Sequence, residues 1–173
     1  MTFEFAILDF IQTHLRSGVG DVLMTLITTL GNGGAIWVAL GLVLCLYRKT
    51  RRWGVAVLLA LVIQVVLSSG ILKPFVGRIR PCDINATVPL LIAHPTDFSF
   101  PSGHTGAAFA TVAALAFGRC KGWLAAGVLA VLMAFSRLYL YVHFPTDVLA
   151  GAMLGILCGW LAVILMDRFA KKT

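Results

Sequence analysis

Charged residues are scarce in this chain. Of its 173 residues, 12% are charged and 60% are hydrophobic. A soluble domain usually contains about 25% charged and 45–50% apolar residues, so this chain has too little polar surface to cover itself in water. The composition therefore argues against a soluble protein and predicts one that is surrounded largely by lipid.

Cysteine is also rare, and its distribution argues against two common uses. The four cysteines form no CxxC pair and no spacing typical of a metal site: Cys45, Cys82, Cys120 and Cys158. We therefore expect four free thiols and no disulfide framework.

Long runs without charge dominate the chain instead. They cover 22–47, 53–72 and 148–166, and two shorter runs cover 105–118 and 122–136. A full membrane span needs about 20 residues, so the outer ends of the shorter runs should be lined by protein. We predict one domain over 1–173, an all-α polytopic membrane helix bundle. About five transmembrane helices are expected near 22–47 (with a possible break at Gly31–Gly34), 53–72, 102–118, 122–141 and 146–168.

The first 20 residues predict an additional helix. Apolar residues recur there at helical spacing, with polar residues between them: Phe3, Ile7, Phe10, Ile11 and Leu15. This pattern is typical of an amphipathic helix at a membrane surface. A helix packed on the bundle is equally compatible with it.

The formal net charge of +7 could indicate a nucleic-acid partner, but the positions of the basic residues argue against one. Most of them lie in two loops and a tail that alternating spans place on one side of the membrane. The positive-inside rule makes that side, and the C-terminus, cytoplasmic. The partner predicted by this pattern is the bilayer. The residues concerned are Arg48, Lys49, Arg51, Arg52, Arg119, Lys121, Arg168, Lys171 and Lys172.

A polar cluster from Lys73 to Pro81 follows the second predicted span, on the non-cytoplasmic side. Lys73 and Arg80 are seven residues apart, so they share a helix face if the helix continues through Pro74. Arg78 would then point away from them and extend toward lipid headgroups.

A second cluster, Phe100 to His104, opens the third predicted span on the same side. Ser102 is a favourable N-cap residue, and the N–H groups at a helix start bind anions. Gly103 would let an anion approach the backbone closely. Without the other clusters, an ordinary capped helix would explain this segment equally well.

The third cluster runs from Ser136 to Asp147, also on that side. Arg137 and His143 are separated by about 600° of helix, so they do not share a face of an unbroken helix. The chain must turn near His143 to bring them together, and Pro145 favours such a turn. Asp147 could then accept a hydrogen bond from the imidazole of His143. A purely structural His–Asp pair is the alternative.

Together the clusters supply three permanent cations, two imidazoles, a hydroxyl and a helix start. Ionisable groups at membrane depth are costly and usually functional. Arginine donates planar, paired hydrogen bonds to phosphate oxygens. This combination predicts a site that holds a tetrahedral phosphate.

The spacing within the clusters matches a known family. The patterns are K-x6-R-P from Lys73 to Pro81, P-S-G-H from Pro101 to His104, and S-R-x5-H-x3-D from Ser136 to Asp147. In these motifs the chain resembles the type 2 phosphatidic acid phosphatase superfamily, lipid phosphatases related to vanadium haloperoxidases and glucose-6-phosphatase. The resemblance implies a catalytic core over 73–147. Family members commonly have six membrane helices, one more than we expect here.

The resemblance also implies the role of each site residue. His143 attacks phosphorus and forms a phosphohistidine, Asp147 orients the imidazole, and His104 protonates the leaving oxygen and later activates water. Phosphate-binding roles fall to Lys73, Arg80, Ser102, Gly103 and Arg137. No metal or cofactor is implied.

A lipid phosphate is the expected substrate, because the site lies at the outer membrane edge. By analogy with small bacterial relatives we favour undecaprenyl diphosphate and a multi-pass protein of the bacterial inner membrane. Phosphatidylglycerophosphate and phosphatidic acid are the alternatives. A transport or non-catalytic lipid-binding protein is a different class, against which the one-sided charges argue. The sequence leaves open the oligomeric state, and whether a lipid tail contacts Tyr139, Tyr141, Phe98 or Phe100.

Overall fold

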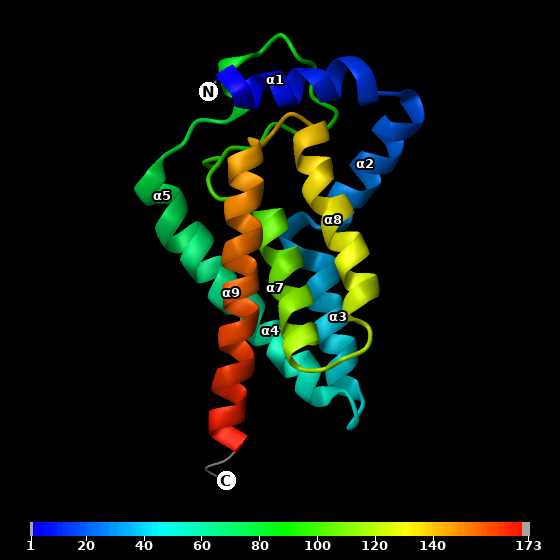
Figure 1. Ribbon diagram of the computed structural model, residues 1–173, viewed down its shortest axis with the longest axis vertical. Helices are drawn as coiled ribbons and strands as arrows, with labels where there is room; N and C mark the ends of the chain where they lie inside the picture. The colour runs from blue at the N-terminus through cyan, green and yellow to red at the C-terminus, as the bar shows by residue number, and fades with distance from the viewer. Residues whose placement is uncertain (1, 171–173) are drawn as a thin grey trace.

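The computed structural model describes residues 2–170 and is all-α over this range (Figure 1). Lys171 and Lys172 of the predicted basic tail lie outside the described residues. The α-helices are α1 (Thr2–Phe10), α2 (Gly18–Leu30), α3 (Ala35–Leu46), α4 (Arg51–Val65), α5 (Lys73–Val76), α6 (Pro81–Ile84), α7 (Gly103–Phe117), α8 (Trp123–Tyr139) and α9 (Pro145–Ala170). Two π-helical segments, Ile11–Leu15 and Val66–Leu72, continue α1 and α4.

The predicted helical bundle is confirmed, but fewer helices are long enough to cross a membrane. Two apolar segments of the described chain have that length: Arg51–Ile84, which is helical except at residues 77–80, and the helix Pro145–Phe169. The pair formed by α2 and α3 makes a third if its 47° bend lies within one span. The other two expected spans, α7 and α8, are apolar helices of fewer residues.

The predicted break near Gly31–Gly34 is confirmed between α2 and α3. Gly33 and Gly34 have φ angles of 59° and 73°. L-residues with side chains rarely adopt such angles, whereas glycine does so at little cost. The two glycines therefore allow the chain to bend between α2 and α3.

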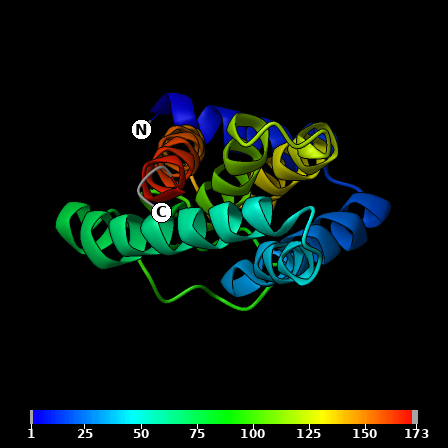
Figure 2. The same cartoon turned by 90° about the horizontal axis from the view of Figure 1, so that it is seen from below.

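Close packing of small residues holds the centre of the bundle together. α7 lies at the centre, between α9, α8 and α4 (Figures 1 and 2). A methyl group placed on Gly151 or Gly159 of α9 would lie 2.6 Å from a backbone oxygen of Ser102 or Ala110. The helices can approach this closely because these positions lack side chains, as is common in membrane helix pairs.

The outer faces of the bundle remain apolar. Large hydrophobic side chains are exposed on α3, α4, α8 and α9, among them Leu42, Val43, Val62, Val128, Val131 and Met153. Soluble proteins rarely expose extensive apolar surface, which marks contact with membrane or partners. Surrounding lipid explains this distribution.

Helix α1 lies across one end of the bundle (Figure 1). Leu8 of α1 and Ile11 of the π-helical segment that follows it are buried against the bundle, with 0% and 5% of their surfaces exposed. The expectation of a helix packed on the bundle is therefore confirmed. Phe3 and Phe10 face outward, and contact of this outer face with a membrane surface stays a prediction.

The two ends of the bundle differ in composition. The basic segments lie at one end of the bundle (Figure 1). They are carried by the α3–α4 connection, the α7–α8 connection and the C-terminal end of α9. Helix α1 and the α8–α9 connection lie at the other. The predicted placement of the basic segments on one side is confirmed as an arrangement within the molecule.

Candidate active site

Lys73 and Arg80 meet, but not through a shared helix face. The helix passes Pro74, ends at Val76, and is followed by Gly77 with φ of 60°. Arg80 then has extended backbone angles, −78° and 154°, just before α6. The expectation of one continuous helix over Lys73–Arg80 is therefore wrong, because the chain leaves the helix at Gly77.

Asp97 joins the two cations. Its Oδ1 accepts a hydrogen bond of 2.6 Å from Arg80 Nη2, and its Oδ2 pairs with Lys73 Nζ. Burial alone would raise the pKa of Asp97, but the hydrogen bonds and charges of Lys73 and Arg80 outweigh it and lower the pKa to about 2. Sequence reasoning missed Asp97, since its loop has no periodic pattern that would reveal its direction.

The start of α7 brings three predicted site residues together. Ser102 occupies the N-cap position, as expected. Its hydroxyl, however, lies 3.0 Å from the Oγ1 of Thr105 and does not cap a backbone N–H. Apart from its chain neighbours and the nearby backbone of α7, no atom of residues 2–170 lies within 4 Å of where a side chain on Gly103 would begin, so open space adjoins the backbone there.

His104 contacts the glycine-rich break. Its Nε2 lies 3.0 Å from Asn32 Oδ1. Sequence reasoning expected a break near Gly31–Gly34 but gave Asn32 no role. The isolated polar residue inside an uncharged run was the available signal.

Arg137 is a buried cation with spare hydrogen-bonding capacity. Only 3% of its surface is exposed, and its Nη1 donates to Thr28 Oγ1. Its Nε finds no partner in the described part of the chain. A buried N–H without a partner costs about 1–3 kcal/mol, which an anion in the site could recover.

The predicted turn at His143 is confirmed. Helix α8 ends at Tyr139, Tyr141 has a φ of 60°, and α9 begins at Pro145. The turn places His143 in the interior, with 1% of its surface exposed.

His143 and Asp147 are adjacent without forming the expected hydrogen bond. His143 Nδ1 lies 3.6 Å from Asp147 Oδ2, beyond hydrogen-bonding distance. That oxygen accepts instead from the backbone N–H of Phe144 at 2.8 Å and from the hydroxyl of Ser99. The prediction of a direct hydrogen bond between His143 and Asp147 is therefore wrong for this structure.

The imidazole of His143 is nevertheless oriented. Its Nε2 lies 3.1 Å from Arg80 Nη1. A guanidinium group can only donate, so Nε2 carries the lone pair and the ring proton lies on Nδ1, facing Asp147. Burial first, then the charges of Arg137 and Arg80, lower the pKa of His143 to about 3, although Asp147 opposes them. The imidazole of His143 is therefore neutral near pH 7.

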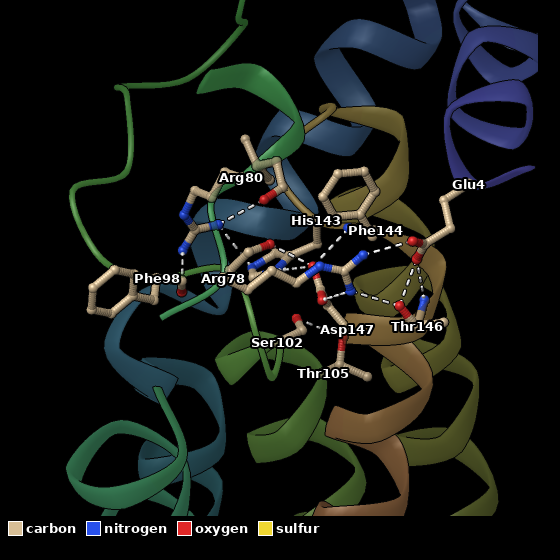
Figure 3. Close-up of polar contacts among 12 residues, drawn as sticks. Glu4, Arg78, Arg80, Phe98, Ser102, Thr105, His143, Phe144, Thr146 and Asp147 are labelled. Atoms are coloured by element: carbon tan, nitrogen blue, oxygen red, sulfur yellow. Dashed lines mark hydrogen bonds and ion pairs between the residues drawn. The ribbon is translucent and has the colours of Figure 1, made fainter. Parts of the chain in front are cut away.

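Arg78 points inward, contrary to expectation (Figure 3). Its Nη1 lies 2.6 Å from Asp147 Oδ1 and its Nη2 lies 2.6 Å from Glu4 Oε2. The prediction that Arg78 extends to lipid headgroups assumed a helix, and the chain has already left the helix at Gly77.

A cavity of about 890 Å³ joins most of the predicted site residues. Lys73, Arg80, Gly103, His104, Arg137 and His143 line it, whereas Ser102 and Asp147 are fully buried without lining it. The cavity continues along an apolar wall from α3 and α4, formed by Val38, Leu58, Leu61, Val62, Val65 and Val66. None of the aromatic residues left open by the sequence, Tyr139, Tyr141, Phe98 and Phe100, lines it.

One group of potential metal ligands occurs in the described part of the chain. The ligand atoms of Cys82, Asp83 and His94 lie within 4.8 Å of one another. His94 already pairs with Asp83 at 2.8 Å. None of the three lines the cavity, so this group is separate from the candidate phosphate site.

Comparisons of the sequence with known proteins point in one direction. A family model described as the PAP2 superfamily matches residues 53–171. An undecaprenyl-diphosphatase of Sulfolobus acidocaldarius is 33% identical over 129 residues, which are 74% of this chain and 62% of that protein. Phosphatidylglycerophosphatase B of Bacillus subtilis is 36% identical over 160 residues, 86% of this chain and 69% of that protein.

Solved structures agree with the sequence comparisons. The crystal structure of LpxE from Aquifex aeolicus has a TM-score of 0.79 and 32% identity, covering 92% of this chain and 93% of that one. A transmembrane PAP2-type phosphatidylglycerolphosphate phosphatase of Bacillus subtilis has a TM-score of 0.73 and 31% identity, covering 99% and 86%. The arrangement of the helices is thus shared along nearly the whole chain.

Proposed function

Because this chain belongs to the PAP2 superfamily, we propose that it is a membrane lipid phosphatase that acts through a phosphohistidine on His143. One observation carries the proposal. The unprotonated Nε2 of His143 adjoins a cavity that three buried cations line: Lys73, Arg80 and Arg137.

In the proposed first step, the Nε2–P bond forms while the bond from phosphorus to the leaving oxygen breaks. Arg80 releases Nε2 and turns its N–H groups to the phosphate oxygens, together with Lys73 and Arg137. The cations and the N–H of Gly103 stabilise the transferring group, and such stabilisation supplies most of the catalysis in phosphoryl transfer. Asp147 stabilises the imidazolium as it forms.

His104 completes both steps as a proton carrier. It donates a proton to the leaving oxygen, then takes one from water as the water attacks the phosphohistidine. Phosphate leaves, and His143 returns to its neutral state. We propose that no metal takes part, because the three buried cations that line the cavity can stabilise the charge of the phosphate.

Undecaprenyl diphosphate is the substrate that we propose first. The undecaprenyl-diphosphatase relative supports it, and the apolar wall along α3 and α4 suits a lipid chain. Phosphatidylglycerophosphate is the second candidate, since a relative and a solved structure bear that activity in their names. Phosphatidic acid remains a third.

The placement in the membrane is also a proposal. We place five crossings, formed by the α2–α3 pair, the helix from α4 to α5, α7, α8 and α9. The basic end would face the cytoplasm of a bacterial cell and the cavity the outer side of its inner membrane. The distribution of basic segments supports this orientation.

Phosphate release from the purified full-length protein tests the reaction. With excess EDTA present, we expect release from at least one of the three lipids, inhibition by vanadate, and no turnover by His143→Ala. His14→Ala, at the exposed end of the N-terminal helix, is a matched control and should retain full activity. Residual wild-type turnover in His143→Ala would overturn the nucleophile assignment, and loss of activity in EDTA would overturn metal independence.

A further inference from the structure

Arg78 lies within the first polar cluster but does not line the cavity. Its guanidinium is 4.2 Å from the centre of the Phe144 ring and bonds Asp147, Thr146 and Glu4 (Figure 3). We propose that Arg78 is a positioning residue that fixes Asp147 and, through it, the imidazole of His143. We further propose that Glu4 of α1 holds Arg78 in place. This inference rests on the proposed roles of His143 and Asp147.

The hydrogen bonds of Asp147 explain why its position depends on Arg78. Its Oδ2 is held by the backbone N–H of Phe144 and by Ser99. Its Oδ1 is held by Arg78 Nη1 at 2.6 Å. Asp147 has no exposed surface, so loss of Arg78 leaves one buried carboxylate oxygen without this charged donor. Because the distance to His143 Nδ1 is already 3.6 Å, a small rotation decides whether the catalytic hydrogen bond forms.

Glu4 joins α1 to both partners of this contact. Its Oε2 accepts from Arg78 Nη2 at 2.6 Å, and its Oε1 accepts from the hydroxyl of Thr146 at 2.5 Å. Phe5 packs edge-on against the Phe144 ring at 5.3 Å. The N-terminal helix therefore contacts the start of α9 beside the catalytic pair, and its placement affects the site directly.

Charge balance predicts a change in pH dependence. The charged and titratable groups that face His143 are Asp147, Arg80, Arg137 and His104. Arg78 faces Asp147 and Glu4. Without Arg78, the negative charge of Asp147 acts on His143 with less compensation, so His143 holds a proton up to a higher pH. The acidic limb of kcat/KM should therefore move upward.

Kinetics of full-length variants test the proposal. Arg78→Ala should lower kcat about 10- to 100-fold, the cost of a misplaced catalytic group, with KM within about 3-fold of wild type. Arg78→Lys should recover part of this loss, because an ammonium group can hold Asp147 without reaching both carboxylates. Glu4→Ala should lower kcat less than Arg78→Ala does, and adding Glu4→Ala to Arg78→Ala should lower kcat by a smaller factor than Glu4→Ala does alone. Arg52→Ala removes an exposed ion pair with Asp167 and should leave kcat unchanged.

Two inhibitors separate positioning from misfolding. Vanadate must bond to an oriented imidazole, so it should inhibit Arg78→Ala more weakly, whereas competitive inhibition by inorganic phosphate should be unchanged. Wild-type kcat and an unmoved acidic limb in Arg78→Ala would overturn the inference, as would equal weakening of both inhibitors. An active His143→Ala variant would instead show that the proposed function has failed.

Discussion

Gly103 illustrates how a single residue can shape the proposed phosphate site. Its backbone begins α7, and among the described residues no atom beyond its chain neighbours and the adjacent helix backbone lies within 4 Å of where a side chain would begin. A substitution therefore meets no steric obstacle within the protein itself. It would instead fill space beside the backbone N–H groups that we propose bind the substrate phosphate.

Gly103→Ala should lower phosphatase activity without destabilising the protein. We expect KM and the inhibition constant for vanadate to rise about 10-fold or more, an effect of about 1.4 kcal/mol on anion binding. Thermal unfolding in detergent should match wild type. Normal vanadate affinity in this variant would show that the phosphate does not approach this part of the backbone.

Asn32 should act on the leaving group through His104. Its Oδ1 lies 3.0 Å from Nε2 of the proposed acid, and both residues line the cavity, so this contact orients the imidazole of His104. Asn32→Ala should slow hydrolysis of a lipid phosphate about 10-fold, a fraction of the 10²–10⁴ that general acid catalysis supplies. An aryl phosphate, whose leaving group needs no proton, should be hydrolysed at nearly the wild-type rate. Equal slowing of both substrates would contradict this role.

The sequence predicted which residues gather around the cavity better than it predicted their contacts. Lys73, Arg80 and Arg137 could be identified because cations are conspicuous in apolar surroundings. The inward direction of Arg78 could not, because it depends on the end of the helix at Gly77. Asp97 was also missed, since its contacts form only when an irregular loop folds back over the helices.

The helices themselves follow from the pattern of charge and glycine. Uncharged runs located α4, α7, α8 and α9 to within a few residues, and glycines located the bend between α2 and α3. The packing of the helices was harder to predict from the sequence, because it depends on which face each helix turns toward its neighbours. The glycine series of α9 is visible in the sequence, but only the structure shows that it packs against α7.

Gly159→Ala should destabilise the contact between α7 and α9. The added methyl group would lie 2.6 Å from the backbone oxygen of Ala110 and 2.7 Å from the nitrogen of Ala114. Backbone atoms cannot move aside as a side chain can, so we expect a loss of about 1–3 kcal/mol. Thermal unfolding of the detergent-solubilised protein measures the change as a lower Tm.

Gly127→Ala on α8 provides the matched control. Its methyl group would lie 4.0 Å from Val112 Cγ1, an ordinary contact. Alanine within a helix is favoured over glycine by about 0.5–1 kcal/mol, so the Tm should be unchanged or higher. Equal stability of the two variants would mean that α7 and α9 are packed less closely than the structure indicates.

At the scale of the whole molecule, the proposed phosphate site and the basic loops are separated along the long axis. The cations of the proposed site, Lys73, Arg80 and Arg137, are buried, whereas the basic loops at the end of the bundle opposite α1 are exposed. Exposed Lys and Arg near helix ends determine orientation in a membrane. The buried cations add little to this bias, because their side chains are paired with other polar groups of the fold. The α1 end should therefore face away from the cytoplasm.

Cysteine labelling in intact cells tests this orientation. Ala86→Cys lies on the exposed loop after α6, near the site, and Lys49→Cys lies on the exposed basic loop between α3 and α4. Each is introduced into a chain whose four native cysteines are replaced by serine, and phosphatase activity confirms that the chain is folded. A maleimide that cannot cross membranes should label Ala86→Cys in intact cells, and Lys49→Cys only after the cells are permeabilised. The reverse pattern would place the phosphate site in the cytoplasm, and the substrate headgroup would then have to lie on the inner leaflet.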